Sequence, residues 1–178
     1  MNMKGRTALI TGATGGLGQH MAETIAELGG RVVLIDRPGS DYTPLTSRLH
    51  QYGTEVFCID CDLESEDERK QLITEVNEQF LSIDVLINNA AFVGTTDLSG
   101  WITSFEEQEI GTWRRAIEVN LTAAFDLSKS LLPLLKESGK GSIINIASIY
   151  GVSGPIHSMY KGTEMGNPAA YSVSKGGL

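Results

Sequence analysis

Two residues near the end of this 178-residue chain, Tyr171 and Lys175, have types and a spacing suited to proton transfer. On a helix, a separation of four places their side chains one turn apart on the same face. A free tyrosine titrates near pH ~10, and lowering its pKa toward ~7 requires about 4 kcal/mol in favour of the phenolate. A lysine ammonium in a sheltered cleft can contribute to that. An isolated YxxxK is more often a pair of helix-surface neighbours, so its interpretation depends on what accompanies it.

A glycine-rich run at the other end of the chain, Thr11 to Gly18, follows a strand-like segment and opens a helix-like one. Its pattern is TGxxxGxG, which differs from the common dinucleotide fingerprint GxGxxG. Such a turn needs a residue with positive φ, followed by bare backbone that lets a pyrophosphate approach the helix N-terminus. Gly12, Gly16 and Gly18 fill these roles. The run therefore predicts a dinucleotide-binding turn, with Thr14 and Leu17 as further contacts.

Asp36 closes the next strand-like segment, where a carboxylate can accept hydrogen bonds from the adenosine ribose hydroxyls. Its charge would repel a 2′-phosphate, and Thr14 and Gly15 carry no charge that would attract one. Arg37 leaves an alternative open, because an arginine there could bind a 2′-phosphate. A solvated strand-end carboxylate is the other interpretation of Asp36. We predict NAD as the cofactor, with NADP as the less favoured choice.

The composition is that of an ordinary globular chain, with 41% hydrophobic and 20% charged residues. A net charge of −8 argues against nucleic acid or an anionic membrane as the main partner, although a locally positive cleft remains compatible with it. The first apolar run, Thr7 to Ile10, is too short for a signal-peptide core or a membrane span, so we expect a cytoplasmic protein.

The two cysteines, Cys58 and Cys61, have CxxC spacing but no second CxxC or histidine pair that would complete a zinc site. We therefore predict no metal. Two cysteines do not make a secreted disulfide scaffold. We expect buried or half-buried structural thiols.

Apolar segments alternate with helix-like segments along the whole chain. Strands are expected at residues 7–10, 31–36, 55–59, 85–88 and 142–146, and helices at 17–28, 43–52, 65–80 and 112–136. Ser65 and Glu68 form a capping-box pattern, and Asn167 and Pro168 are typical of an N-cap and first helical residue before Tyr171. Apolar strands separated by helices indicate an α/β fold, a doubly wound parallel sheet covered on both faces. We expect one domain over residues 1–178.

These motifs together resemble the short-chain dehydrogenase/reductase family over nearly the whole chain. Asp62-Leu63 resembles the family's adenine-pocket pair, and Asn88-Asn89-Ala90-Ala91 resembles its NNAG segment, with Ala91 in place of the usual glycine. The resemblance implies a Rossmann-like fold. The expected cofactor contacts are Gly12, Thr14, Gly16, Leu17, Gly18, Asp36, Asp62, Leu63, Asn89, Ala90, Tyr171 and Lys175.

Three further segments resemble those that carry the family's catalytic residues: the stretch ending in Asn120, the strand and turn ending in Ser148, and the YxxxK from Tyr171 to Lys175. Ser148 would hydrogen-bond the substrate oxygen. The resemblance implies that Asn120 holds a water in a proton relay reaching Lys175. We expect an enzyme, a homo-oligomer that transfers a hydride between NAD(H) and a small-molecule secondary alcohol or its carbonyl.

Two features depart from the family pattern. The interval from Ser148 to Tyr171 is longer than usual, with extra residues around 154–166 that resemble bacterial members linked to surface-sugar modification. Tyr160 in this segment is no rival catalytic tyrosine, because no lysine follows four residues later. The chain stops at Leu178, whereas family members continue through further strands.

If the polypeptide ends at Leu178, the strand at 142–146 becomes an open apolar edge, which invites pairing with another chain. We then expect self-association and little or no dehydrogenase activity. The alternative function is a truncated, non-catalytic NAD-binding or dimerisation module. Retention of Asn120, Ser148, Tyr171 and Lys175 favours the enzyme.

Overall fold

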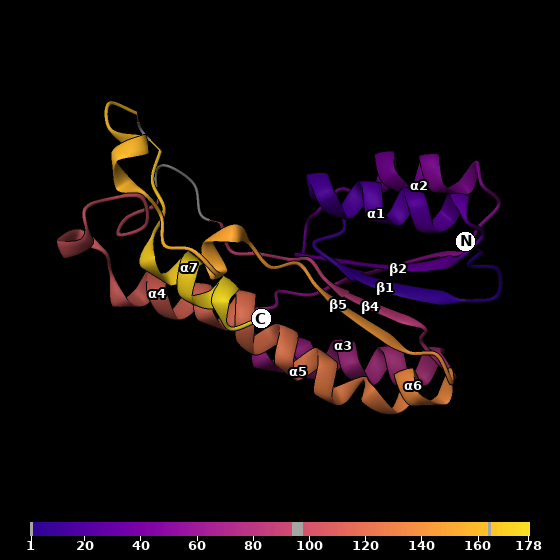
Figure 1. Ribbon diagram of the computed structural model, residues 1–178. Coiled ribbons are helices and arrows are strands. Elements are labelled where there is room, and N and C mark those ends of the chain that lie inside the picture. The colour runs from indigo at the N-terminus through magenta and orange to yellow at the C-terminus, as the bar shows by residue number, and fades with distance from the viewer. Residues whose placement is uncertain (1, 94–97, 164) are drawn as a thin grey trace. The chain divides into compact units, whose positions relative to one another are not determined.

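The computed structural model describes residues 2–93, 98–163 and 165–178 (Figure 1). These residues form two compact units. The sheet unit comprises Met1–Ala90 and Phe125–Asn145, and the helical unit comprises Ala91–Ala124 and Ile146–Leu178. The expectation of one domain over 1–178 stays a prediction, because the compactness of each unit does not decide whether they fold together.

The sheet unit is built on five parallel strands in the order β3-β2-β1-β4-β5, which confirms the predicted doubly wound α/β fold. The strands are β1 Thr7–Thr11, β2 Arg31–Asp36, β3 Val56–Asp60, β4 Val85–Asn88 and β5 Ser142–Asn145. Every residue of central β1 is buried, as expected for a strand covered on both faces. The edge strand β5 differs from this expectation, since all four of its residues are exposed.

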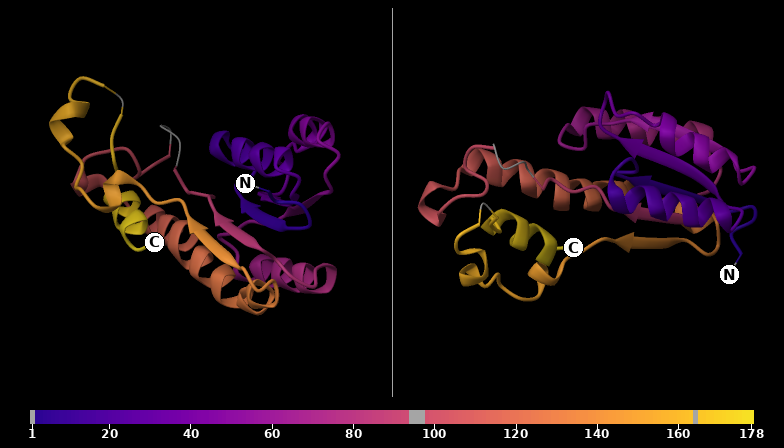
Figure 2. Two further views of the ribbon diagram at one scale, coloured as in Figure 1. Left: turned by 45° about the vertical axis from the view of Figure 1, so that its right-hand side comes forward. Right: turned by 90° about the horizontal axis from the view of Figure 1, so that it is seen from above.

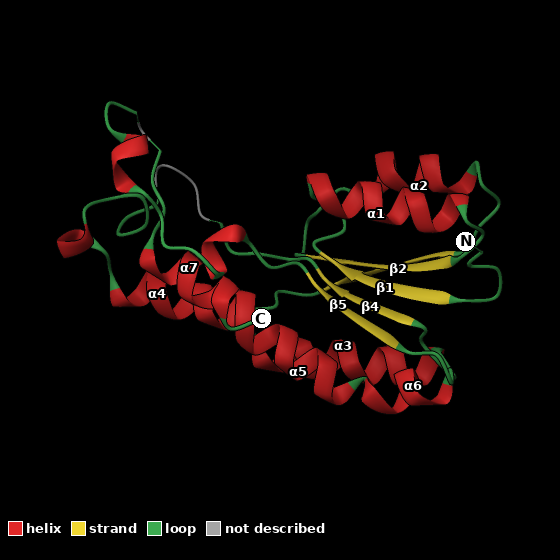
Figure 3. Ribbon diagram, in the orientation of Figure 1, coloured by secondary structure: helices red, strands yellow, loops and turns green. Residues whose placement is uncertain are grey.

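Helices lie on both sides of this sheet (Figures 1 and 3). On one side lie α1 Gly16–Glu27 and α2 Thr43–His50, and on the other lie α3 Glu66–Gln79, α5 Ala123–Ser130 and α6 Leu132–Glu137. Ser65 Oγ accepts a hydrogen bond from Glu68 N at 3.3 Å, which confirms the predicted N-cap of α3. The Glu68 carboxylate does not bond back to Ser65. It accepts from Asp62 N at 2.6 Å and so ties α3 to the end of β3.

The helical unit contains α4 Ile110–Ile117 and α7 Ala169–Gly176, which lie side by side (Figures 1 and 2). Short turns complete it: η1 Phe105–Glu107, η2 Glu118–Thr122, η3 Ile149–Gly151 and η4 His157–Tyr160. Trp101, Ala116 and Ala170 form its buried apolar cluster, against which Trp113 and Tyr171 pack.

The single helix predicted over 112–136 is wrong. The chain instead forms α4, a π-helical turn at Glu118–Thr122, then α5 and α6. Pro133 explains the break before α6, because proline has no N–H to continue the hydrogen-bond ladder and is tolerated in the first turn of a helix. The π-turn contains Asn120, and such turns are frequent at functional sites.

The predicted start of α7 is also corrected. Pro168 stands at the N-cap, with φ −64° and ψ 145°, and Ala169 is the first helical residue. Asn167 does not cap the helix, because its Oδ1 accepts from Ser172 Oγ at 3.4 Å. Gln108 takes the capping role from a distant segment, since its Oε1 accepts from Ala169 N at 3.1 Å.

The cysteines were expected to be buried or half-buried, and only Cys61 is. Cys58 is exposed, because β3 is an edge strand of the sheet. Burial, followed by the charge of Glu68, raises the pKa of the Cys61 thiol to about 12, which makes it a poor nucleophile. Among the described residues no group of three His, Cys, Asp or Glu could hold a metal ion. Within the same residues, no helix has the length and apolar character that crossing a membrane requires.

Within the sheet unit, Arg69 on α3 bonds to α5 and to the loop that follows β3. Its side chain is 3% exposed; Nε donates to Asp126 Oδ2 on α5 at 3.0 Å and Nη1 donates to Leu63 O at 2.6 Å. Asp126→Asn would replace the charged acceptor at Nε of this buried guanidinium by a neutral one. We expect the free energy of unfolding to fall by about 1–2 kcal/mol, measured by urea denaturation.

The matched control is Lys70→Gln on the same helix, because Lys70 pairs with Glu66 in solvent at 2.7 Å. This variant should unfold like the parent. Equal free energies of unfolding for both variants would show that the charge of Asp126 beside the buried Arg69 does not matter to stability.

Candidate functional site

The strand order reverses direction between β1 and β4, since β2 and β3 extend the sheet from β1 and β5 extends it from β4. In open α/β sheets, ligands bind beyond the carboxyl ends of the strands at such a switch point. The glycine turn follows β1, and Asn89 and Ala90 follow β4. The two segments meet, because Asn89 Nδ2 donates to Gly12 O at 3.0 Å. The fold thus brings together two of the predicted cofactor segments.

The three predicted turn glycines differ in what requires them. Gly12 has φ +64°, and a Cβ there would lie 2.8 Å from Ala90 Cα. A Cβ on Gly18 would lie 2.2 Å from Gly12 O. The fold therefore requires glycine at both positions, whether or not a ligand binds there. A Cβ on Gly16 would meet no atom within 4 Å, so the fold does not require glycine there.

The start of α1 is chemically suited to an anion. The first N–H groups of a helix have no partners within the helix, and they carry the positive end of its dipole. Gly15 at the N-cap has no side chain to satisfy them, and the first turn carries no acidic residue. Leu17 in this turn is 61% exposed. A pyrophosphate fits such a helix start, where the bare Gly16 allows close approach.

Asp36 lies half-buried at the end of β2 and is held by the glycine turn. Its Oδ2 accepts from Thr14 N at 2.8 Å and from Thr14 Oγ1 at 2.7 Å, and its Oδ1 accepts from Arg37 N at 2.9 Å. A carboxylate offers about four acceptor positions, so these three hydrogen bonds leave one for a ribose hydroxyl.

Asn89 binds the turn through its side chain. Its Nδ2 donates to Thr11 O at 2.9 Å as well as to Gly12 O. Thr11 Oγ1 in return accepts from Asn89 N at 3.1 Å and from Ala90 N at 3.0 Å. The sequence reasoning omitted Thr11 from the site, although its place before the first turn glycine was a signal. Thr11 and Asn89 together fix the distance between the ends of β1 and β4.

Asp62 and Leu63 follow β3 in the sheet unit. Asp62 is half-buried, and its Oδ1 accepts from Glu64 N at 3.0 Å. Leu63 is buried. Their expected contact with adenine stays a prediction.

Tyr171 and Lys175 lie one turn apart on α7 in the helical unit, as the spacing predicts. Lys175 is only 4% exposed, and its Nζ donates to Ile146 O at 2.7 Å. Within the described residues no carboxylate pairs with it, and burial lowers its pKa. Tyr171 is half-buried. An ammonium buried without an anionic partner is costly and is not what a surface pair on a helix would show.

Ser148 lies beside the same helix. Its Oγ accepts from Tyr150 N at 3.2 Å and caps the turn Ile149–Gly151, which leaves the hydroxyl proton available to another acceptor. This turn packs closely on α7, because a Cβ on Gly151 would lie 2.5 Å from Lys175 O.

Asn120 is 1% exposed and joins the π-turn to α7. Its Nδ2 donates to Ser174 Oγ at 2.9 Å and to Phe92 O at 3.3 Å, and its Oδ1 accepts from Phe92 N at 2.5 Å. Ser174 Oγ in turn donates to Tyr171 O at 2.9 Å. The amide is thus committed to positioning the helix of Tyr171. Its role in holding a water stays a prediction.

The expected site residues therefore fall into two groups. Asn120, Ser148, Tyr171 and Lys175 all belong to the helical unit, and every other expected cofactor contact belongs to the sheet unit.

Comparison with known proteins gives consistent matches. The family model described as short chain dehydrogenase matches residues 6–178. The rhamnolipids biosynthesis 3-oxoacyl-acyl-carrier-protein reductase of Pseudomonas aeruginosa is 32% identical over 99% of this chain and 64% of its own length.

Two solved structures are similar. An NAD+-bound xylitol dehydrogenase gives a TM-score of 0.83 at 28% identity, over 99% of this chain and 62% of that one. A short chain dehydrogenase from Escherichia coli CFT073, complexed with NADPH, gives 0.82 at 27% identity, over 98% of this chain and 68% of that one. This chain thus spans about two thirds of the length of these relatives. Because the family model covers residues 6–178, the chain belongs to the short-chain dehydrogenase/reductase family.

Proposed function

We propose that this chain carries the dinucleotide-binding and proton-transfer residues of an NAD(H)-dependent oxidoreductase that acts on a secondary alcohol or its ketone. The observation that carries the proposal is the buried Lys175, one helical turn from Tyr171 and bonded through Nζ to Ile146 O at 2.7 Å. A structural role alone gives no reason to bury an ammonium that has no carboxylate partner among the described residues.

The nicotinamide, when bound, accepts or supplies the hydride. Tyr171 takes the proton from the alcohol, or returns it to the carbonyl oxygen. An ammonium has three N–H donors, and the bond to Ile146 O uses one, so two remain for the Tyr171 oxygen and a ribose hydroxyl. Ser148 donates a hydrogen bond from its hydroxyl group to the substrate oxygen, where charge develops.

The choice of NAD over NADP rests on Asp36. Its carboxylate is fixed beside the glycine turn by Thr14, so a 2′-phosphate would meet a negative charge that cannot easily turn away. The similar structures include one with NAD+ and one with NADPH, so these relatives leave both cofactors open.

The reacting group of the substrate is a hydroxyl/carbonyl pair on carbon. The names of the relatives, a xylitol dehydrogenase and a 3-oxoacyl reductase, support this class without choosing between a polyol and an oxoacyl compound.

Tyr171→Phe removes the transferable proton and little else. We expect turnover to fall by about 10²–10⁴-fold while NADH affinity stays near that of the parent. Turnover would be followed by NADH absorbance over a panel of secondary alcohols and ketones, and affinity by calorimetry. Tyr52→Phe, at an exposed tyrosine just after the end of α2, is the matched control and should leave both unchanged. Parent-like turnover in Tyr171→Phe would remove this mechanism from consideration.

Asp36→Ala should narrow the difference between NADH and NADPH affinity, because it removes the ribose acceptor and the charge that repels a 2′-phosphate. The parent should bind NADH more tightly in calorimetric titration. Asp41→Ala makes the same change of net charge at an exposed neighbouring loop residue and should leave the preference intact. Tighter binding of NADPH by the parent would overturn the assignment and direct attention to Arg37.

Gly16 and Gly18 provide a matched pair for the cofactor site. Gly18→Ala forces a Cβ against Gly12 O, so it should lower the free energy of unfolding by at least about 1–3 kcal/mol. Gly16→Ala meets open space, so thermal stability should stay or rise, whereas NADH affinity should fall by about tenfold, or 1.4 kcal/mol. Undiminished NADH binding by Gly16→Ala would show that the cofactor does not approach this position.

A further inference from the structure

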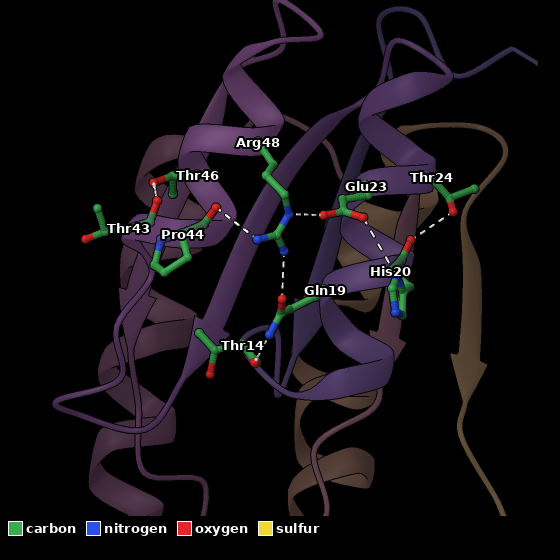
Figure 4. Close-up of polar contacts among 9 residues, drawn as sticks. All are labelled: Thr14, Gln19, His20, Glu23, Thr24, Thr43, Pro44, Thr46 and Arg48. Atoms are coloured by element: carbon green, nitrogen blue, oxygen red, sulfur yellow. Dashed lines mark hydrogen bonds and ion pairs between the residues drawn. The ribbon is translucent and has the colours of Figure 1, made fainter.

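A hydrogen-bond network reaches the glycine turn from α2, which lies beside α1 (Figure 4). Arg48 on α2 uses all three guanidinium nitrogens: Nη2 donates to Gln19 Oε1 at 2.7 Å, Nε donates to Glu23, and Nη1 donates to Pro44 O at 3.1 Å. Gln19 and Glu23 lie one turn apart on α1. One arginine therefore holds two side chains of the helix that follows the turn.

The Gln19 side chain that accepts from Arg48 also donates a hydrogen bond to the glycine turn. Its Nε2 donates to Thr14 O at 2.6 Å, which is the carbonyl of the peptide between Thr14 and Gly15. The N–H of that same peptide belongs to Gly15 and donates to Gly12 O at 3.2 Å. Both polar ends of one peptide group are thus held, immediately before the helix start where an anion would bind.

Arg48 decides which end of the Gln19 amide faces the turn. A guanidinium has only donors, so it must meet the amide oxygen. The NH₂ group is then directed to Thr14 O. Without Arg48, the amide can rotate and place its oxygen against that carbonyl, where two acceptors would repel each other.

The composition of the glycine turn explains why hydrogen bonds from Gln19 would matter for its order. Four of its residues, Gly12, Gly15, Gly16 and Gly18, are glycines, the residue type that loses most backbone freedom on ordering. A turn that orders only when the ligand arrives loses affinity to that entropy, whereas a preorganised one does not. Thr14 adds a second consequence, because its N–H and hydroxyl hold Asp36 Oδ2 at 2.8 and 2.7 Å.

We propose that Gln19 and Arg48 are positioning residues of the dinucleotide site, which hold the Thr14–Gly15 peptide and, through Thr14, the Asp36 carboxylate in the binding geometry before the cofactor arrives. The inference rests on the proposed binding of a dinucleotide at this turn. It assigns to α2 a part in cofactor affinity, although Arg48 itself contacts only Gln19, Glu23 and Pro44 in the bonds described above.

Glu23 offers a control that separates positioning from simple attachment of α2 to α1. It binds Arg48 through Nε and lies one turn beyond Gln19, away from the turn peptide (Figure 4). Glu23→Gln therefore weakens the contact between the two helices and leaves the path from Arg48 through Gln19 to Thr14 in place.

The test compares Gln19→Glu, Arg48→Met, the double variant and Glu23→Gln. Gln19→Glu keeps an acceptor for Arg48 but loses the donor to Thr14 O. Because it also adds a negative charge near the start of α1, the lost hydrogen bond is assessed by hydrogen exchange in the ligand-free chain as well as by affinity. The readouts are NADH and NADPH affinity by calorimetry, thermal unfolding without ligand, and hydrogen exchange of residues 12–18 in the ligand-free chain.

We expect Gln19→Glu to lose about tenfold in NADH affinity, which is 1.4 kcal/mol, and Arg48→Met to lose several-fold. The loss of NADH affinity in the double variant should be smaller than the product of the two single fold losses, because both changes act on the Thr14–Gly15 peptide. Exchange at the turn should quicken in all three. Glu23→Gln should match the parent in affinity and in exchange, even where its unfolding midpoint falls with that of Arg48→Met.

Two different failures can be told apart. A parent chain that binds neither NADH nor NADPH contradicts the proposed function, while exchange of residues 12–18 still reports on the network. A parent that binds NADH, with Gln19→Glu and Arg48→Met indistinguishable from Glu23→Gln in affinity and exchange, overturns the positioning role.

Discussion

The sheet unit depends on one close approach of backbone to backbone, where the start of α1 folds back on the turn that precedes it. A Cβ on Gly18 would lie 2.2 Å from Gly12 O, so only glycine permits this approach. The turn then stands between the ends of β1 and β4, where Thr11 and Asn89 hold it with four hydrogen bonds at 2.9–3.1 Å. Because the backbone is fixed this tightly, the N–H groups of α1 point to one place, which is the requirement for binding a pyrophosphate rather than merely tolerating one.

The helical unit also depends on a close approach of backbone to backbone, here between the turn after Ser148 and α7. Gly151 lets the Ser148 turn pack on the backbone of α7, and buried Asn120 bonds to Ser174 of the same helix. These contacts bring Ser148 and Asn120 to α7 from segments far apart in the sequence. The buried lysine is the costly element, because burial lowers its pKa and disfavours its charged form. Under the proposed function, Tyr171 one turn away would give a reason for a lysine at this position.

The sequence predicted the parts of the fold that depend on local pattern. Apolar runs located all five strands within about a residue, which is the usual uncertainty of element ends, and Ser65 marked the start of α3. Patterns could not reveal the π-turn at Asn120, whose neighbours are ordinary helix residues, nor that Gln108 would cap α7 from 61 positions away. Pro133 was a visible signal for the break before α6. For the candidate site, residue type and spacing pointed to Asp36 and the family resemblance to Asn89. Neither could reveal their partners, because Thr14 and Thr11 reach them only in the folded chain.

The contacts of Asp36 give the selectivity proposed for it a physical basis that the residue type alone lacks. Three of its about four acceptor positions are already used, so a ribose that offers two hydroxyls must displace one donor. The Thr14 hydroxyl is the donor that can rotate away, whereas the N–H groups of Thr14 and Arg37 are fixed by the backbone. Exchanging one hydroxyl for another costs little, since each protein bond lost is replaced by an equivalent one. A 2′-phosphate has acceptor oxygens in place of that hydroxyl. It would therefore displace the Thr14 hydroxyl from Asp36 without donating a hydrogen bond in its place. If the proposed preference for NAD holds, discrimination against NADP would follow as much from the unpaired carboxylate left behind as from charge repulsion.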